Sequence, residues 1–322
     1  MNKKDKTILK IKDLEVLYPV RIGLVKAVDK VGLELKKGQT LGLVGESGCG
    51  KSTLGFSILK LIPPPGKIVG GEIIFDGEDL VKKTEKKMIK IRGKRISMIF
   101  QDPMTSLNPL MRIGDHIVET ILTHEKELNK KEAKNRTEDL VDRLGISKLR
   151  LNDYPHQFSG GMRQRVMIGL ALALNSDLII ADEPTTSLDV IVEAQILDLL
   201  KELRSTYELT IILITHNMGV VSELVDRIAI MYAGRIVEIA DCFPLFDKPF
   251  HPYTIGLLKS IPNISLEKQE LEIMPGSPPD LINPPTGCRF HPRCVNTMKK
   301  CSMYEPPLKE AKENHLVRCW LY

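Results

Sequence analysis

One eight-residue stretch constrains this chain more than any other feature. It carries glycine at its first, fourth and sixth positions, ends in Lys-Ser, and reads Gly45-Glu46-Ser47-Gly48-Cys49-Gly50-Lys51-Ser52. An apolar run, residues 41–44, precedes it, and a helical pattern that ends before Pro63 follows it. Glycines allow the backbone to curl its N–H groups around an anion at the start of a helix. The stretch therefore predicts a phosphate-binding loop between a strand and a helix, and with it an α/β fold.

The residue types in this loop have separate tasks. The backbone N–H groups cradle phosphates, Lys51 contacts the β- and γ-phosphates of a nucleotide, and Ser52 coordinates Mg²⁺. A glycine-rich structural turn is the alternative, and the strand before the loop and the helix after it disfavour that interpretation. The predicted ATP-binding set is Gly45, Glu46, Ser47, Gly48, Cys49, Gly50, Lys51, Ser52 and Thr53.

Two carboxylates follow a second apolar run. Residues 178–181 lead directly into Asp182 and Glu183, and ligands of α/β proteins bind at the carboxyl ends of strands. Asp182 is suited to hold Mg²⁺, and Glu183 is suited to accept a proton from the water that attacks the γ-phosphate. A solvated pair of loop carboxylates is the alternative, but it does not explain the apolar strand before them.

A second glycine-rich helix start lies upstream of the carboxylates. Ser159-Gly160-Gly161 precedes a helical pattern over residues 163–174, which makes another anion-binding helix N-terminus. Taken alone, it would more often be an ordinary helix cap. Its position changes this interpretation, because Ser159 stands 23 residues before Asp182. Together with the phosphate loop, this order of motifs resembles that of ATP-binding cassette (ABC) ATPases, and the resemblance extends over residues 7–240.

The resemblance to ABC ATPases implies roles for four further residues. Tyr18 matches the aromatic position that stacks on adenine, and Gln101 matches the glutamine that contacts the metal ion or the attacking water. His216 matches the histidine that hydrogen-bonds the γ-phosphate. Asp189, in Ser187-Leu188-Asp189, matches the D-loop. In this family two nucleotide domains close head to tail, so we expect ATP to lie between the phosphate loop of one subunit and Ser159, Gly160 and Gly161 of the other.

Hydrophobic periodicity predicts two classes of strand. Residues 9–12 and 31–36 alternate apolar and polar side chains, which indicates half-buried antiparallel strands. Residues 41–44, 178–181 and 210–215 are continuously apolar, which indicates parallel strands covered on both faces. We therefore expect an α/β, P-loop ABC-type nucleotide-binding domain with a parallel core sheet and an N-terminal antiparallel sheet. Charged helical patterns predict a helical subdomain inserted at about residues 103–164.

The chain changes character after residue 240. We expect an ABC ATPase domain over residues 1–240, then a family-specific extension and proline-rich linker over residues 241–287, in which periodicity is lost past Pro262. Residues 288–322 form a module with four cysteines. Its large apolar residues are too few for an independent core. We therefore expect an inorganic staple there and a structural or docking role that leaves nucleotide binding by the ATPase domain intact.

The four cysteines of this module are Cys288, Cys294, Cys301 and Cys319. A cluster of cysteines in a reducing cytosol indicates metal before disulfides. Their spacing lacks the close pairs of zinc knuckles, so it favours a 4Fe–4S cluster over structural zinc or simple buried thiols. Seven Lys and Arg against three Glu in residues 288–322 would offset the anionic charge of a thiolate-bound cluster. Cys49 and Cys242 stand outside the array.

Composition excludes several classes of protein. Hydrophobic residues at 43% and charged residues at 27% are ordinary globular values, and no apolar run approaches the ~20 residues that cross a bilayer. The charged start, residues 1–6, shows no secretory signal. A net charge of +5 is too small to indicate a nucleic-acid partner.

The tail selects a branch of the family. His251-Pro252-Tyr253-Thr254 and the segment from Gly287 to Cys294 resemble the C-terminal extension of dipeptide and oligopeptide importer ATP-binding subunits. The resemblance implies an ATP-hydrolysing subunit at the cytoplasmic face of the cell membrane. Its partners would be two transmembrane permeases, a second ATPase that is a paralogue or another copy, and, indirectly, a solute-binding protein. The solute stays open among dipeptides, oligopeptides and nickel complexes.

Two other functions compete with the importer. A soluble ABC ATPase acting on nucleic acid or ribosomes would use the basic tail, but the chain has no aromatic-rich basic stretch for base stacking. A regulatory cassette without hydrolysis is the other alternative, and Glu183 and His216 argue against it. We expect no nucleic-acid partner.

Overall fold

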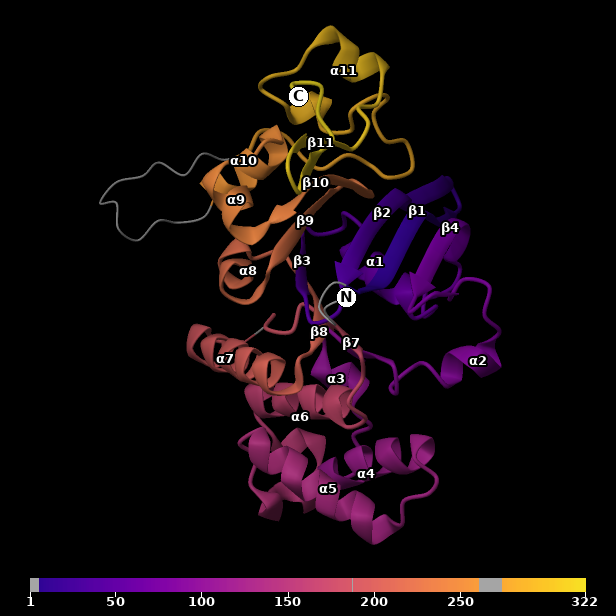
Figure 1. The fold of residues 1–322 in the computed structure, drawn as a ribbon, viewed down its shortest axis with the longest axis vertical. Coiled ribbons are helices and arrows are strands. Elements are labelled where there is room, and N and C mark those ends of the chain that lie inside the picture. The colour runs from indigo at the N-terminus through magenta and orange to yellow at the C-terminus, as the bar shows by residue number, and fades with distance from the viewer. Residues whose placement is uncertain (1–5, 187, 261–273) are drawn as a thin grey trace, which may run out of the picture. The chain divides into compact units, whose positions relative to one another are not determined.

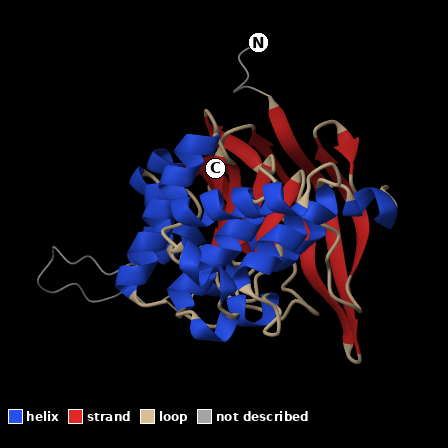
Figure 2. Cartoon of the chain, turned by 90° about the horizontal axis from the view of Figure 1, so that it is seen from below, coloured by secondary structure: helices blue, strands red, loops and turns tan. Residues whose placement is uncertain are grey.

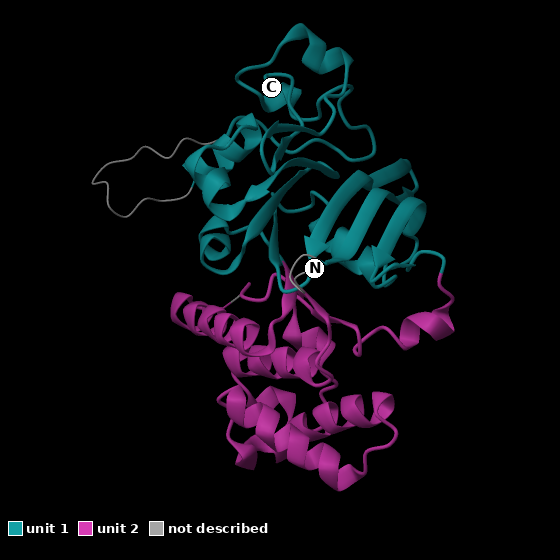
Figure 3. Cartoon of the chain, in the orientation of Figure 1, with its two compact units in different colours: residues 1–82, 213–322 teal, residues 83–212 magenta. Residues whose placement is uncertain are grey.

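The computed structural model describes residues 6–186, 188–260 and 274–322 (Figure 1). Helices and strands both contribute throughout, as expected for an α/β protein (Figure 2). The chain divides into two compact units, unit 1 with residues 1–82 and 213–322 and unit 2 with residues 83–212 (Figure 3). The second boundary falls inside strand β8 (Thr210–Thr215). The domain limits expected at residues 240 and 287 stay predictions, and part of the proline-rich segment, residues 261–273 with Pro262, lies outside the described residues.

The N-terminal sheet of unit 1 is antiparallel, as the period-two patterns predict. Its strands are β1 (Thr7–Val20), β2 (Gly23–Lys36), β4 (Lys67–Phe75) and β5 (Glu78–Asp79), in the order β2-β1-β4-β5 (Figure 1). Leu9, Ile11, Leu14 and Val16 are buried along β1. Alternate residues of a strand point to opposite faces, so Leu9 and Ile11 share a face, as do Leu14 and Val16. The register shift between Ile11 and Leu14 changes the alternation between the two pairs.

The second group of strands in unit 1 combines parallel and antiparallel pairs. Strand β3 (Thr40–Val44) pairs in parallel with β9 (Arg227–Tyr232), and β10 (Arg235–Asp241) runs antiparallel to β9. Strand β12 (His315–Val317) pairs with β10, and β11 (Lys309–Lys312) pairs with β12. All five residues of β3 are buried, which agrees with its continuously apolar sequence. The core sheet is therefore mixed, because β10 is antiparallel to β9 and the tail strands β12 and β11 add two further antiparallel pairs at its edge.

The tail, residues 288–322, is stabilised by packing onto the rest of unit 1. Phe250, Val317 and Cys319 form one buried cluster. Glu238 of β10 is fully buried and accepts hydrogen bonds from the backbone N–H groups of Phe250 (2.7 Å) and His251 (3.0 Å). The ring of His315 in β12 lies 2.6 Å from the same carboxylate. The tail has few apolar side chains of its own, and it obtains a core by joining β10.

Short helices complete unit 1. Helix α1 (Lys51–Ile58) follows the phosphate loop, α8 (Met218–Leu224) follows β8, and α9 (Cys242–Asp247) and α10 (Pro252–Lys259) follow β10. A 3₁₀ turn, η4 (His291–Arg293), and α11 (Lys299–Met303) lie in the four-cysteine module. Proline begins α10 and stands inside η4, where its fixed φ suits the first helical turn.

Unit 2 contains two parallel strands and most of the helices. Strands β6 (Ile96–Ile99) and β7 (Leu178–Asp182) pair in parallel. The helices are α2 (Glu85–Ile89), α3 (Pro103–Ser106), α4 (Ile113–His124), α5 (Lys130–Arg143), η2 (Lys148–Asn152), η3 (Pro155–Gln157), α6 (Gly160–Leu172) and α7 (Val190–Tyr207). Asn129 and Glu132 form a capping box that starts α5. No described helix is long and apolar enough to cross a membrane.

Candidate functional site

The predicted phosphate loop connects β3 to α1 in unit 1. Two of its glycines are required by close packing: a Cβ on Gly45 would collide with the carbonyl oxygen of Met231, and one on Gly50 would collide with that of Ala27. Gly50 also has a φ of +106°, a conformation that other residues rarely adopt. The N–H of Gly234, in the turn between β9 and β10, donates to Cys49 O at 2.9 Å. The loop is therefore held by the strands around it.

Lys51 is buried within this loop. It is 4% exposed, and its Nζ donates to the carbonyl oxygens of Gly45 (2.8 Å) and Glu46 (3.0 Å). The ammonium charge thus stands among the loop's backbone groups, at the start of a helix, where an anion is favoured. Burial raises the pKa of the Cys49 thiol, which keeps this cysteine neutral beside Lys51. The arrangement suits phosphate binding and leaves no thiolate in the loop.

Glu46 is attached to the C-terminal part of the chain. Arg293 donates from Nη1 to Glu46 Oε2 (2.8 Å) and from Nη2 to Glu46 Oε1 (2.9 Å). The backbone N–H of Glu46 donates to Tyr253 Oη at 2.9 Å. The sequence placed Glu46 in the phosphate cradle and separated the tail from nucleotide binding. The first contact joins the four-cysteine module to the second residue of the loop, and the expected independence of nucleotide binding stays a prediction.

The two predicted carboxylates stand at the end of β7 in unit 2. Asp182 is 2% exposed, and Glu183 is half-buried with a left-handed backbone, φ +46°. Gln101 Nε2 donates to Glu183 Oε2 at 2.8 Å, and Thr186 Oγ1 donates to the same oxygen at 2.9 Å. The structure therefore brings together Gln101 and Glu183, which the sequence singled out independently. Thr186 was missed, although its position three residues after Glu183 in a turn is a local signal.

Ser159 and Asp189 both cap helices of unit 2. Ser159 is exposed and accepts from the N–H of Met162 at 3.4 Å at the start of α6. Asp189 accepts from the N–H of Val192 at 3.0 Å at the start of α7. A Cβ on Gly161 would collide with the side chain of Val192. The ordinary capping role is thus present for Ser159, and it leaves the side chain at the surface. Ser187 lies outside the described residues.

The remaining predicted nucleotide contacts lie in unit 1. Tyr18 is half-buried in β1, and its ring packs closely against Gly66. His216 is exposed and directly follows β8. The next residue, Asn217, accepts from the N–H of Gly219 at 2.9 Å and so starts α8. His216 therefore lies exposed between the end of β8 and the start of α8.

The four cysteines of the tail lie close together. Cys301 and Cys319 are buried, Cys288 and Cys294 are half-buried, and the N–H of Cys288 donates to Cys301 O at 2.7 Å. Burial, together with the other three thiols, raises the pKa of Cys288 to about 11. The six cysteines form no disulfide. Across residues 6–186, 188–260 and 274–322, no three His, Cys, Asp or Glu side chains are arranged to hold a metal ion.

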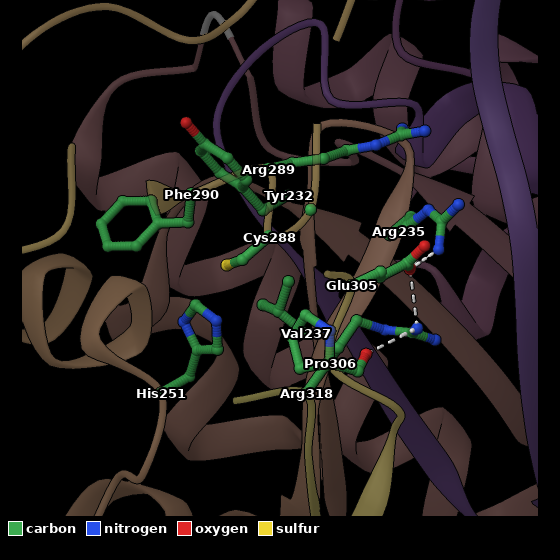
Figure 4. A pocket seen from close by; sticks show the side chains of 11 residues that line it. Tyr232, Arg235, Val237, His251, Cys288, Arg289, Phe290, Glu305, Pro306 and Arg318 are labelled. Atoms are coloured by element: carbon green, nitrogen blue, oxygen red, sulfur yellow. Dashed lines mark hydrogen bonds and ion pairs between the residues drawn. The ribbon is translucent and has the colours of Figure 1, made fainter. Parts of the chain in front are cut away.

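Cys288 also connects the cysteines to the core of unit 1. It lines a cavity of about 10 Å³ together with Tyr232, His251 and Phe290. Figure 4 shows these side chains around the thiol, with the ion pairs that Glu305 makes on the opposite side. The ring of Tyr232 lies 5.2 Å from that of Phe290 and 4.6 Å from that of Tyr253. An aromatic cluster therefore separates the cysteines from the phosphate loop.

Two family profiles match the chain. The ABC transporter family matches residues 28–186, and the oligopeptide/dipeptide transporter C-terminal region matches residues 237–301. The oligopeptide transport ATP-binding protein OppD of Bacillus subtilis (strain 168) is 50% identical over 318 residues, which cover 98% of this chain and 88% of the relative. OppD of Escherichia coli (strain K12) is 44% identical, with 97% and 93% covered.

A solved structure supports the same assignment. The ATP-binding cassette MJ0796, in a dimeric post-hydrolysis state bound to ADP and phosphate, is 28% identical with a TM-score of 0.65, over 73% of this chain and 99% of that one. The similarity to OppD spans both the phosphate loop and the cysteine-bearing tail. This chain therefore belongs to the ABC transporter ATP-binding proteins of the oligopeptide and dipeptide transport family.

Proposed function

We propose that this chain hydrolyses ATP to drive the uptake of dipeptides or oligopeptides through transmembrane permease partners. The observation that carries the hydrolytic part is the hydrogen bond from Gln101 to Glu183, 2.8 Å long. It joins two residues of the predicted chemistry that stand 82 positions apart in the sequence. The transport part rests on the oligopeptide/dipeptide C-terminal region, which matches residues 237–301.

Each unit contributes separate groups to the proposed reaction. In unit 1, Lys51 and the loop N–H groups bind the phosphates, Tyr18 stacks on adenine, and His216 hydrogen-bonds the γ-phosphate. Ser52 is assigned to Mg²⁺ in unit 1, and Asp182 and Gln101 are assigned to it in unit 2. Hydroxyl, carboxylate and amide oxygens are ligands that suit this hard cation. When bound, Mg²⁺ neutralises charge on the phosphate oxygens.

Glu183 is the proposed general base. Its carboxylate takes a proton from water while the water oxygen bonds to the γ-phosphorus, and the bond from that phosphorus to the β–γ bridging oxygen breaks. The products are ADP and phosphate. Gln101 and Thr186 both donate to Oε2 of Glu183. They fix the orientation of the carboxylate, which is the geometric condition for proton transfer.

We assign the N-terminus of α6 to a partner's nucleotide. Ser159, Gly160 and Gly161 lie at an exposed helix start, where N–H groups and the helix dipole favour an anion. Binding there to ATP held by a second ATPase subunit, a paralogue or another copy, closes the pair head to tail. In this proposal the closed pair acts on two permeases at the cytoplasmic face of the membrane, and the solute-binding protein acts only indirectly.

Copurification from native membranes tests this function. We expect the tagged chain to bring down two permeases and a second ATPase subunit. Ribosomal proteins or DNA in their place would instead support a soluble ATPase that acts on nucleic acid, and would overturn the importer.

We also propose that the four cysteines hold a 4Fe–4S cluster. The thiols of Cys288, Cys294, Cys301 and Cys319 influence one another electrostatically, so they share one neighbourhood. The guanidinium groups of Arg289 and Arg318 are buried in the same segment and offset the negative charge that four thiolates would bring.

Anaerobic purification should yield a brown protein with about four iron per chain, as expected for four thiolate ligands. Replacing any one of the four cysteines with serine should remove the iron, because a hydroxyl is a poor cluster ligand. Cys242→Ser is the matched control, since Cys242 is also a free thiol of unit 1 but lies in α9, and it should keep full iron content. Iron and zinc are measured by plasma mass spectrometry. Stoichiometric zinc without iron would contradict the cluster.

A further inference from the structure

The four-cysteine module, residues 288–322, carries one arginine onto the phosphate loop. The side chain of Arg293 is 6% exposed and that of Glu46 is 25% exposed. Two parallel hydrogen bonds of 2.8 and 2.9 Å join them. This paired geometry is the strongest form of an arginine–carboxylate contact. It also raises the pKa of Arg293, chiefly through the hydrogen bond to Glu46, so the guanidinium keeps its positive charge.

Arg293 is itself held rigidly within its segment. Its Nε donates to Pro275 O at 2.9 Å, and its Nη1 lies 3.4 Å from Tyr232 Oη. The guanidinium stands over the rings of Tyr232 (5.7 Å) and Phe290 (6.0 Å). A guanidinium group held by this many partners loses little further conformational entropy when it binds a carboxylate. Arg293 therefore presents a fixed binding surface to the loop.

The turns around Arg293 are continuous with the cysteines. The N–H of His291 donates to Cys288 O (3.0 Å), that of Arg293 to Phe290 O (2.9 Å), and that of Cys294 to His291 O (3.3 Å). Arg293 thus stands in a 3₁₀ turn between two of the four cysteines. Any change that unfolds the turn also removes the arginine from the loop.

The charge of Glu46 explains why this contact matters for ATP. A carboxylate one residue into the loop would repel a triphosphate if nothing neutralised it. Arg293 supplies the neutralising charge, and Tyr253 holds the N–H of the same residue at 2.9 Å. Both attachments come from the C-terminal part of the chain, so the shape and the charge of the loop depend on it.

We propose that Arg293 is a positioning residue of the nucleotide site, and that ATP affinity depends on the folding of the four-cysteine module that carries it. The inference rests on the proposed ATP site. It replaces the sequence-based expectation that changes in the module leave nucleotide binding intact. Because coupling between two sites is reciprocal, bound nucleotide should also stabilise residues 288–322.

Calorimetric titration of the full chain with a non-hydrolysable ATP analogue and Mg²⁺ tests the proposal. We expect Arg293→Ala to weaken binding by about tenfold, because apparent affinity falls with the fraction of chains whose loop is binding-competent. Arg293→Lys should give an intermediate loss, since it keeps the charge but not the paired geometry. Lys309→Ala is the matched control. This exposed cation of the same module lies in β11, away from the phosphate loop, so affinity should stay near wild type.

A double-mutant cycle separates positioning from general folding. In the Glu46→Gln background, Arg293→Ala should have much less effect, because its carboxylate partner is already gone. Hydrogen exchange gives a second readout. Arg293→Ala should speed exchange in residues 45–52, Lys309→Ala should not, and the analogue should slow exchange in residues 288–322 of the wild-type chain.

Three results would overturn the inference: wild-type affinity in Arg293→Ala, equal losses in Arg293→Ala and Lys309→Ala, or no effect of the analogue on exchange in residues 288–322. The last measurement uses only the wild-type chain and therefore stands even if Arg293→Ala does not fold. A wild-type chain that binds no analogue at all would instead count against the proposed ATP site.

Discussion

Glu183→Gln should keep ATP and Mg²⁺ binding and lose hydrolysis by about 10²–10⁴-fold in the assembled transporter, the usual effect of removing a general base. Glutamine keeps an oxygen that can accept from Gln101 and Thr186, which now donate to Oε2 of Glu183. The change therefore removes the proton acceptor and preserves the local geometry. Phosphate release measures hydrolysis, and calorimetry measures binding.

Lys51→Ala is the contrasting variant for this prediction. It removes the ammonium group from the phosphate loop, so nucleotide binding itself should weaken. Glu183→Gln should thus lose hydrolysis but keep nucleotide binding, whereas Lys51→Ala should lose both. Near-normal hydrolysis by Glu183→Gln would show that another group accepts the proton.

Ser159→Arg should leave ATP binding by the isolated subunit nearly unchanged and prevent ATP-dependent closure of the subunit pair. Hydrolysis should then fall by about 10²-fold or more, the scale for losing one donor to a transition-state oxygen. Ser159 is exposed at the start of α6, so an arginine there is placed where the partner's nucleotide should bind. Closure is measured by light scattering of the purified ATPase pair in the Glu183→Gln background.

Asn129→Arg is the matched control for Ser159→Arg. Asn129 is also an exposed helix cap in unit 2, at the start of α5. Losing a cap costs about 1 kcal/mol of stability, so this control reports the cost of cap loss without touching α6. Its closure should be normal. Loss of ATP binding by isolated Ser159→Arg would rule out the head-to-tail arrangement for this protein.

Local patterns were sufficient for much of the fold and of the site. The phosphate loop was predictable because Gly45, Gly50 and Lys51 must occur in order between a strand and a helix. Asp182 and Glu183 were predictable because a buried strand leads into them. The antiparallel character of β1 and β2 follows from their period-two burial. Each of these features depends on residues close together in the chain, so each can be recognised from a local sequence pattern.

Other features depended on which distant segments meet. The core sheet is mixed because β10 runs antiparallel to β9 and β12 runs antiparallel to β10, and no periodicity in these strands indicates which partner each one pairs with. The tail was expected to lack a core of its own, and Phe250 now packs with Val317 and Cys319. An apolar count within residues 288–322 could not anticipate this, because the packing partner lies outside that range.

The sequence by itself determined the phosphate loop between a strand and a helix, and it predicted a general base at Glu183 and a common role for four grouped thiols. Only the tertiary structure decided that Arg293 pairs with Glu46, 247 residues away, and that the cysteine module is thereby joined to the phosphate loop. The physical reason is that a charged side chain selects its partner by proximity and burial in the folded chain, whereas sequence patterns report backbone geometry and burial over a few turns or strands.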